Sequence, residues 1–173
     1  MDEIRFKYRL DKRSRRITWM TLTAILVVFG GLWAFSLGEY LSAWFLSIAT
    51  AVVCLSILSI PRSLRVTEQA LEIRCTVEIT HIPYEHIESV RRIGRTELGR
   101  IIPLFASPGV FGYFGWWLDV RNWDIVKVYA SSWHGLVLIE DIYEQRYIVS
   151  ADDPDRLVEA LDTECTRSKE GID

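Results

Sequence analysis

Cysteine is scarce in this chain, with three among 173 residues, and histidine is equally rare. The cysteine count is odd and no two cysteines have the CxxC spacing of a metal site, so neither a disulfide framework nor a zinc site is indicated. The three histidines (His81, His86 and His134) form no HExxH pair, and no serine lies in a GxSxG turn. We therefore expect no catalytic residues, no metal site and no cofactor.

An excess of positive charge is also missing. Lysine and arginine number 20 against 23 acidic residues, which gives a net charge of −3. Nucleic-acid-binding domains usually carry a basic surface, so we expect no nucleic-acid partner. Half of the residues are hydrophobic and a quarter are charged. Both proportions fit in one chain because the two kinds of residue are segregated along it.

Charge is absent from two consecutive runs, residues 17–37 and 41–60. A helix of either length crosses the roughly 30 Å hydrocarbon core of a bilayer. Only three residues separate the runs, and Pro61 follows the second. A cleaved signal peptide and a buried soluble hairpin are the alternatives, and the presence of two such runs in succession disfavours both. We predict an antiparallel transmembrane hairpin over residues 17–60.

Basic residues predict the orientation of this hairpin. Seven lie in segment 1–16, Arg62 and Arg65 follow the second run, and the turn between the runs has none. The positive-inside rule then places both termini in the cytoplasm. The cluster Lys12–Arg16 has two interpretations, either as this topology signal alone or as a site that also attracts anionic lipid headgroups.

A third uncharged run, residues 101–118, has the length of a span but not its composition. Pro103, Pro108 and three glycines spaced three apart disfavour a helix, and a lone strand is not stable in lipid. We predict a glycine-punctuated loop and strand of a folded domain. Its aromatic side chains either fill the core or lie exposed against the membrane surface or a partner. They are Phe111, Tyr113, Phe114, Trp116 and Trp117.

The remaining chain, residues 62–163, predicts a β-rich domain. Short alternating runs such as residues 70–75 and 124–131 indicate about seven strands. Asp153 at an N-cap and Pro154 at the first helical position predict one C-terminal helix, and residues 164–173 are expected to form a polar tail. The fold class expected is α+β: a helical hairpin, then a curled sheet with a helix at its open end.

Three segments carry a resemblance to a known family. IPYEHIESV, SPGVFGYFG and YIVSADDPDRLVEAL resemble segments of the bacterial pleckstrin-homology-like (PH-like) domain family, with one position of the helix-cap pattern different, at Ala151. The resemblance implies a PH-like, partly open β-barrel, and members often follow one or two membrane spans. It also implies the bacterial inner membrane as location. It says little of function, because this fold binds lipids, ligands and proteins on unrelated surfaces.

Arginines just before the aromatic run are the most notable charged group. They form either a solvated face or a site for an anionic headgroup or acidic partner. The candidate binding residues are Arg91, Arg92, Arg95, Phe111, Tyr113, Phe114, Trp116 and Trp117, with Arg100 beside them.

The function expected is a membrane-anchored, non-enzymatic binding or scaffolding module whose partner is a protein or a second copy of the chain. The alternatives are recognition of lipid headgroups or of the membrane surface, and an accessory subunit of a membrane enzyme or transporter. The absence of charge within the two runs disfavours the last of these.

Overall fold

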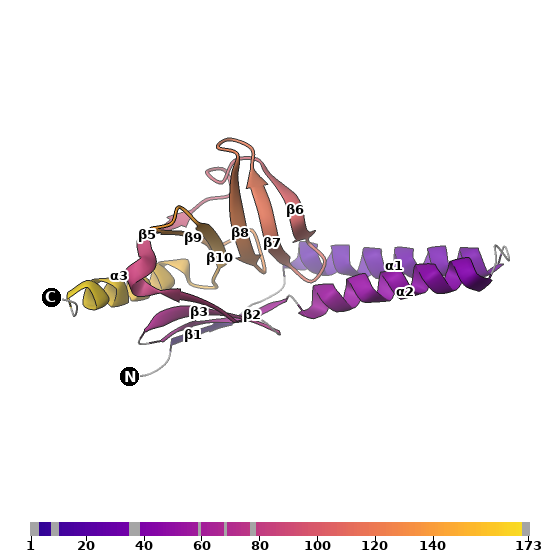
Figure 1. Cartoon of the computed structure of the whole chain (residues 1–173), viewed down its shortest axis with the longest axis horizontal. Helices are drawn as coiled ribbons and strands as arrows, with labels where there is room; N and C mark the ends of the chain where they lie inside the picture. Colours follow the sequence, from indigo (N-terminus) through magenta and orange to yellow (C-terminus); the bar gives the residue numbers. More distant parts are fainter. Residues whose placement is uncertain are drawn as a thin grey trace.

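The computed structural model describes residues 4–7, 11–34, 39–58, 60–67, 69–76 and 79–170. Two long helices, α1 (Lys12–Ala34) and α2 (Glu39–Leu58), lie side by side and extend away from a β domain (Figure 1). Their connection falls outside the described residues. By length and composition α1 is able to cross a membrane, whereas the apolar part described in α2 is shorter, Ala43–Leu55.

The first sheet is antiparallel and has the order β1-β2-β3-β4. Its strands are β1 (Ile4–Lys7), β2 (Pro61–Val66), β3 (Ala70–Cys75) and β4 (Ile79–Pro83). Strand β1 precedes the hairpin in the chain, yet Phe6 lies opposite Leu64 of β2, and both side chains are buried. Segment 1–16 is therefore more than a basic tail, because it supplies an edge strand to the domain and the start of α1.

The second sheet has the order β5-β9-β10-β8-β7-β6. Its strands are β5 (Ile87–Ile93), β6 (Ile101–Pro108), β7 (Tyr113–Asp119), β8 (Asp124–Ala130), β9 (Leu136–Asp141) and β10 (Arg146–Ser150). The short helix η1 (Tyr84–His86) joins the two sheets. All pairings are antiparallel except that of β8 with β10.

Hydrophobic packing on both sides of the second sheet explains the apolar run in β9. Val137 and Ile139 face a core shared with the first sheet and α3 (Pro154–Glu170), whereas Leu136 and Leu138 face a core enclosed by the second sheet alone. A strand buried on both faces is apolar at successive positions rather than at alternate ones. The second core lies beneath β6 and β7, which is where the candidate site is found.

The sequence predictions are partly confirmed. The fold is α+β, and the run 101–118 belongs to the domain as β6, β7 and their connection. The expected seven strands are ten in the described chain, in two sheets. The expected polar tail 164–173 is helical as far as Glu170, because Cys165 still packs against the core. The sequence prediction missed these contacts because they come from pairing between distant segments.

Candidate functional site

The connection between β6 and β7 is clamped onto the first turns of α1. The Ser14 hydroxyl donates a 2.7 Å hydrogen bond to the carbonyl oxygen of Gly109, and the backbone N–H of Phe111 donates a 2.9 Å bond to Thr18 Oγ1. Ser14 and Thr18 are both buried. Gly109 has a φ of +130°, which residues with a side chain rarely adopt, and a Cβ there would lie 2.8 Å from Ile17 Cδ1, so glycine favours this approach. We call these contacts the α1 clamp.

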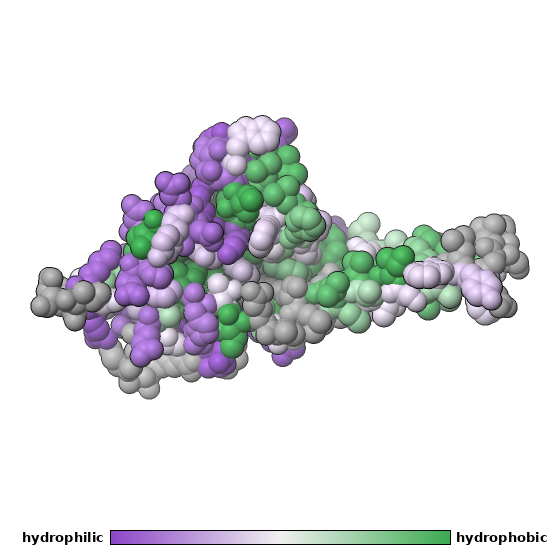
Figure 2. All heavy atoms as spheres, viewed as in Figure 1, coloured by the Kyte–Doolittle hydropathy of each residue, from purple (hydrophilic) through white to green (hydrophobic). Residues whose placement is uncertain are grey.

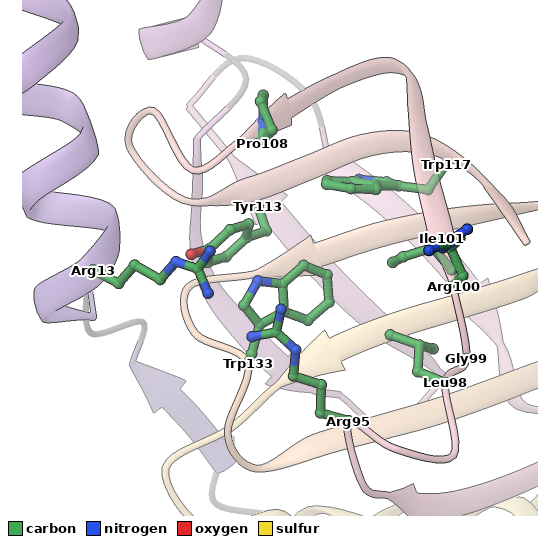
Figure 3. Close-up of a pocket in the computed structure, with 10 residues that line it drawn as sticks. All are labelled: Arg13, Arg95, Leu98, Gly99, Arg100, Ile101, Pro108, Tyr113, Trp117 and Trp133. Atoms are coloured by element: carbon green, nitrogen blue, oxygen red, sulfur yellow. The ribbon is translucent and has the colours of Figure 1, made fainter.

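A cavity of about 450 Å³ lies beside the α1 clamp (Figure 3). It collects side chains from the start of α1, from the β5–β6 connection, from β6 and β7, and from the β8–β9 connection. The lining residues are Arg13, Arg95, Leu98, Gly99, Arg100, Ile101, Pro108, Tyr113, Trp117 and Trp133. We call this cavity the arginine–aromatic pocket.

Three aromatic rings form one wall of the pocket. Tyr113 and Trp117 are an even number of positions apart on β7, so their side chains point to the same side of the strand. Both point inward and both are buried. Trp133 meets them from the β8–β9 connection, with ring centroids 4.6 Å from Tyr113 and 5.8 Å from Trp117. The close approach of β7 to β6 requires Gly115, because a Cβ there would lie 2.3 Å from the Phe105 carbonyl oxygen.

Positive charge surrounds the mouth of the pocket. The Arg95 guanidinium lies 5.2 Å from the centre of the Trp133 ring, in a cation–π arrangement, and Figure 3 shows the Arg13 guanidinium beside the Tyr113 hydroxyl. Arg100 completes the set. None of these three guanidinium groups makes an ion pair within the described part of the chain. Among the described residues that line the pocket, none is acidic.

Two buried polar atoms in the pocket wall make no hydrogen bond among the residues described, the Tyr113 hydroxyl and the Trp117 indole N–H. Burial raises the pKa of the Tyr113 hydroxyl above its ordinary value. Arg13 acts to lower that pKa, as does the neighbouring Trp133, and Asp11 acts to raise it. Trp133 makes no hydrogen bond of good geometry to the hydroxyl. Buried polar atoms normally have partners, and these two have almost no accessible surface, so they are enclosed in the pocket wall and are not open to the cavity.

The predicted binding residues divide into two groups. Arg95, Tyr113 and Trp117 meet in the pocket. The other five do not line it. Arg91 is exposed on β5 and Arg92 pairs with Asp155 at 2.7 Å. Phe111 belongs to the α1 clamp, and Phe114 and Trp116 point to the other side of β7, with Phe114 buried and Trp116 half exposed.

Three of the charged and aromatic residues that line the pocket, Arg13, Arg100 and Trp133, were missing from the predicted set. Arg13 had been considered within the cluster Lys12–Arg16, either as a topology signal alone or as a site that also attracts lipid headgroups, and Arg100 had been considered with the other arginines but not chosen as a site residue. Nothing in the sequence around Trp133 marked it, because it reaches the pocket through the pairing of β7 with β8. A second hollow of about 640 Å³ lies on the other side of Arg95 and Trp133, but it contains Glu97 and so is less uniformly basic.

Other groups capable of chemistry lie apart from one another. His81 lies 3.6 Å from Glu72 and His86 lies 3.8 Å from Glu85, each near the surface. Over the described ranges, no three His, Cys, Asp or Glu residues gather as metal ligands would. The arrangement of the pocket suits binding by hydrogen-bond donors and positive charge.

The family described as Bacterial PH domain matches residues 62–165. The chain belongs to this family. The match begins after the two helices and ends within α3, so it contains the second sheet and every pocket residue except Arg13. The chain matches no curated protein and no solved structure at a significant level. A PH-like domain is in general a binding module and not an enzyme.

Proposed function

We propose that this protein is a membrane-anchored binding module that presents its PH-like domain at the cytoplasmic face of the bacterial inner membrane. In this proposal α1 and α2 form a transmembrane hairpin and both termini are cytoplasmic. The uncharged runs 17–37 and 41–60 and the basic residues around them support this topology. The contacts of the α1 clamp hold the domain against the first turns of α1, so the two are not joined by a free linker alone.

The pocket is the proposed binding site, and it takes an anionic group rich in hydrogen-bond acceptors. The observation that carries this proposal is the composition of its polar lining. Three guanidinium groups line it that make no ion pair among the described residues, and none of the described lining residues carries a carboxylate. Charge-assisted hydrogen bonds from guanidinium to phosphate or carboxylate are strong and often bidentate. In the proposed topology, the position of Arg13 at the start of α1 supports a location of this site at the membrane surface.

Two sources supply such a group at this position, the headgroup phosphate of an anionic lipid and a soluble phosphate compound. The full chain in nanodiscs separates them. One arm adds inorganic phosphate to nanodiscs of phosphatidylcholine, and the other compares phosphatidylcholine nanodiscs with ones that contain phosphatidylglycerol. Trp133 stacks under Arg95, so tryptophan fluorescence reports occupancy.

We expect a fluorescence change in one of the two arms, and we expect R13Q, R95Q or R100Q to weaken the binding that causes it. Loss of one charge-assisted hydrogen bond of about 1.5–3 kcal/mol lowers the affinity roughly tenfold or more. R91Q is the matched control, because Arg91 is exposed on β5 outside the pocket. No fluorescence change in either arm contradicts the proposal. An equal loss of affinity in R91Q also contradicts it.

The anchoring is tested separately. The full chain should remain in the membrane pellet after alkaline carbonate extraction, and tags at both ends should resist protease in sealed spheroplasts. Digestion of either tag from outside the cell would contradict the proposed topology.

A further inference from the structure

The outer side of β6, β7 and β8 carries a continuous row of exposed apolar side chains. Phe105 is 84% exposed and lies opposite Trp116, which is 50% exposed, and Leu118 lies between Ile102 and Ile125 in the next row. We call this surface the β6 patch; it consists of Ile102, Leu104, Phe105, Trp116 and Ile125. Contiguous exposed apolar residues on a folded domain mark a contact surface.

The patch lies on the side of the domain from which the helices leave. In Figure 1 β6 is the strand of the second sheet closest to α1 and α2, and it runs across their direction. Figure 2 shows hydrophobic residues gathered over β6–β8 and along the helices, whereas the α3 end is mainly hydrophilic. The clamp places the end of β6 at Ser14, Ile17 and Thr18, where the uncharged run of α1 begins.

We infer that the β6 patch lies in the headgroup region of the bilayer, so that the domain rests on lipid along the edge of its second sheet. This inference rests on the proposed membrane anchoring but not on the proposed ligand. A strand that crosses the helix direction lies roughly along the membrane plane when α1 is inserted. Its exposed side chains then meet the lipid interface, where Trp and other amphipathic or apolar groups partition favourably.

The composition of the patch favours lipid over a second protein chain. Strand β6 has no charged residue, and Lys127 lies opposite Trp116 within the sheet, the combination of aromatic and basic groups found at membrane interfaces. An exposed edge strand also invites pairing with another strand. Pro103 and Pro108 in β6 lack the N–H groups that such pairing needs.

Site-directed spin labelling of the full chain in phosphatidylcholine–phosphatidylglycerol nanodiscs tests the inference. Single labels are placed at F105C, at I142C as an equally apolar exposed control in the β9–β10 turn, and at V28C in α1, in a background with the three native cysteines replaced. Each label's collisions with oxygen, which partitions into lipid, are compared with those of a water-soluble nickel chelate. Unchanged thermal unfolding shows that each variant is folded.

We expect the oxygen-to-nickel collision ratio to be several-fold higher at residue 105 than at residue 142, and highest at residue 28. A ratio at residue 105 equal to that at residue 142, with residue 28 in lipid, overturns the inference and leaves the anchoring intact. A label at residue 28 in water overturns the anchoring itself. Low access to both reagents with spin–spin broadening at residue 105 shows a second copy on the patch and also overturns the inference.

Discussion

The hydroxyl of Ser14 donates a 2.7 Å hydrogen bond to the carbonyl oxygen of Gly109, although the two residues are 95 positions apart. Ser14 lies in the first turns of the helix proposed to enter the membrane, and Gly109 lies in the loop between two strands of the PH-like domain. The bond is fully buried. Helix and domain are therefore parts of one packed unit at this point. We expect a displacement of the helix to move the residues of the pocket beside it.

Breaking the clamp should destabilise the domain. In S14A the buried Gly109 carbonyl loses its hydroxyl donor, and an unsatisfied buried group costs about 1–3 kcal/mol. T18V should cost a similar amount, because it removes the acceptor of the Phe111 N–H. The free energy of unfolding of the full chain in detergent measures both effects.

The matched control for T18V is T163V. The Thr163 hydroxyl donates to the carbonyl oxygen four residues earlier in its helix, as that of Thr18 does, but Thr163 is exposed and accepts no hydrogen bond from a loop among the residues described. Equal losses in the two variants would contradict a special role for the clamp.

A methyl group at residue 115 should disrupt the β6–β7 pair. Gly115 has φ of +107°, and its added Cβ would lie 2.3 Å from the Phe105 carbonyl oxygen, within the backbone of the neighbouring strand. We expect G115A to lose about 2–4 kcal/mol from overpacking together with backbone strain. G94A is the control, because the nearest atoms to its Cβ are side-chain oxygens at 3.6 Å. Chemical denaturation of both variants provides the comparison, and a stable G115A would show that this part of the β6–β7 register is wrong.

The ion pair between Asp119 and Arg146 should matter for stability. It joins β7 to β10 at 3.1 Å, and the Asp119 side chain is almost fully buried. D119A leaves a largely buried guanidinium with only Glu140, at 3.6 Å, so we expect a loss of about 3 kcal/mol. D155A breaks the exposed pair with Arg92 and should cost less than about 1 kcal/mol. Thermal unfolding of the two variants distinguishes these outcomes, and equal losses would contradict the prediction.

Alkaline pH should destabilise the protein. Burial raises the pKa of Tyr84, Tyr113 and Tyr147 above 10.0 and that of Cys165 above 9.0. When the pH exceeds the ordinary pKa of these groups, the unfolded chain loses protons that the folded chain keeps. Their contribution to stability is therefore complete below about pH 9 and is lost as the pH rises further. The unfolding temperature followed from about pH 8 to about pH 11 tests this.

Tyr84 should account for part of that slope. Its hydroxyl donates to the carbonyl oxygens of Thr67 and Ala70, and burial is the largest cause of its raised pKa. Y84F removes the titrating group and should flatten the dependence of stability on pH, although loss of the bifurcated hydrogen bond lowers stability at neutral pH. A dependence as steep as that of the parent would exclude Tyr84 as a contributor.

Local patterns were enough to predict several features. The uncharged runs predicted two long apolar helices. The prolines and glycines of residues 101–118 correctly excluded a long apolar helix in that run. Asp153 and Pro154 predicted the start of α3 to the residue. For the candidate site, Arg95, Tyr113 and Trp117 were predicted because charge and aromatic density are visible in short segments.

The tertiary structure decided the rest, because it depends on which distant segments pair. The sequence does not show that β1 crosses back to β2, that β8 runs parallel to β10, or that the strands divide into two sheets. Trp133 enters the pocket through the pairing of β7 with β8, and Arg13 enters it through the contact of α1 with the β6–β7 connection. The sequence by itself determined that long apolar helices are joined to a β domain, since hydropathy and strand periodicity are local properties. Only the fold decided that the first turns of α1 complete the domain's pocket, since that required a buried contact between Ser14 and Gly109.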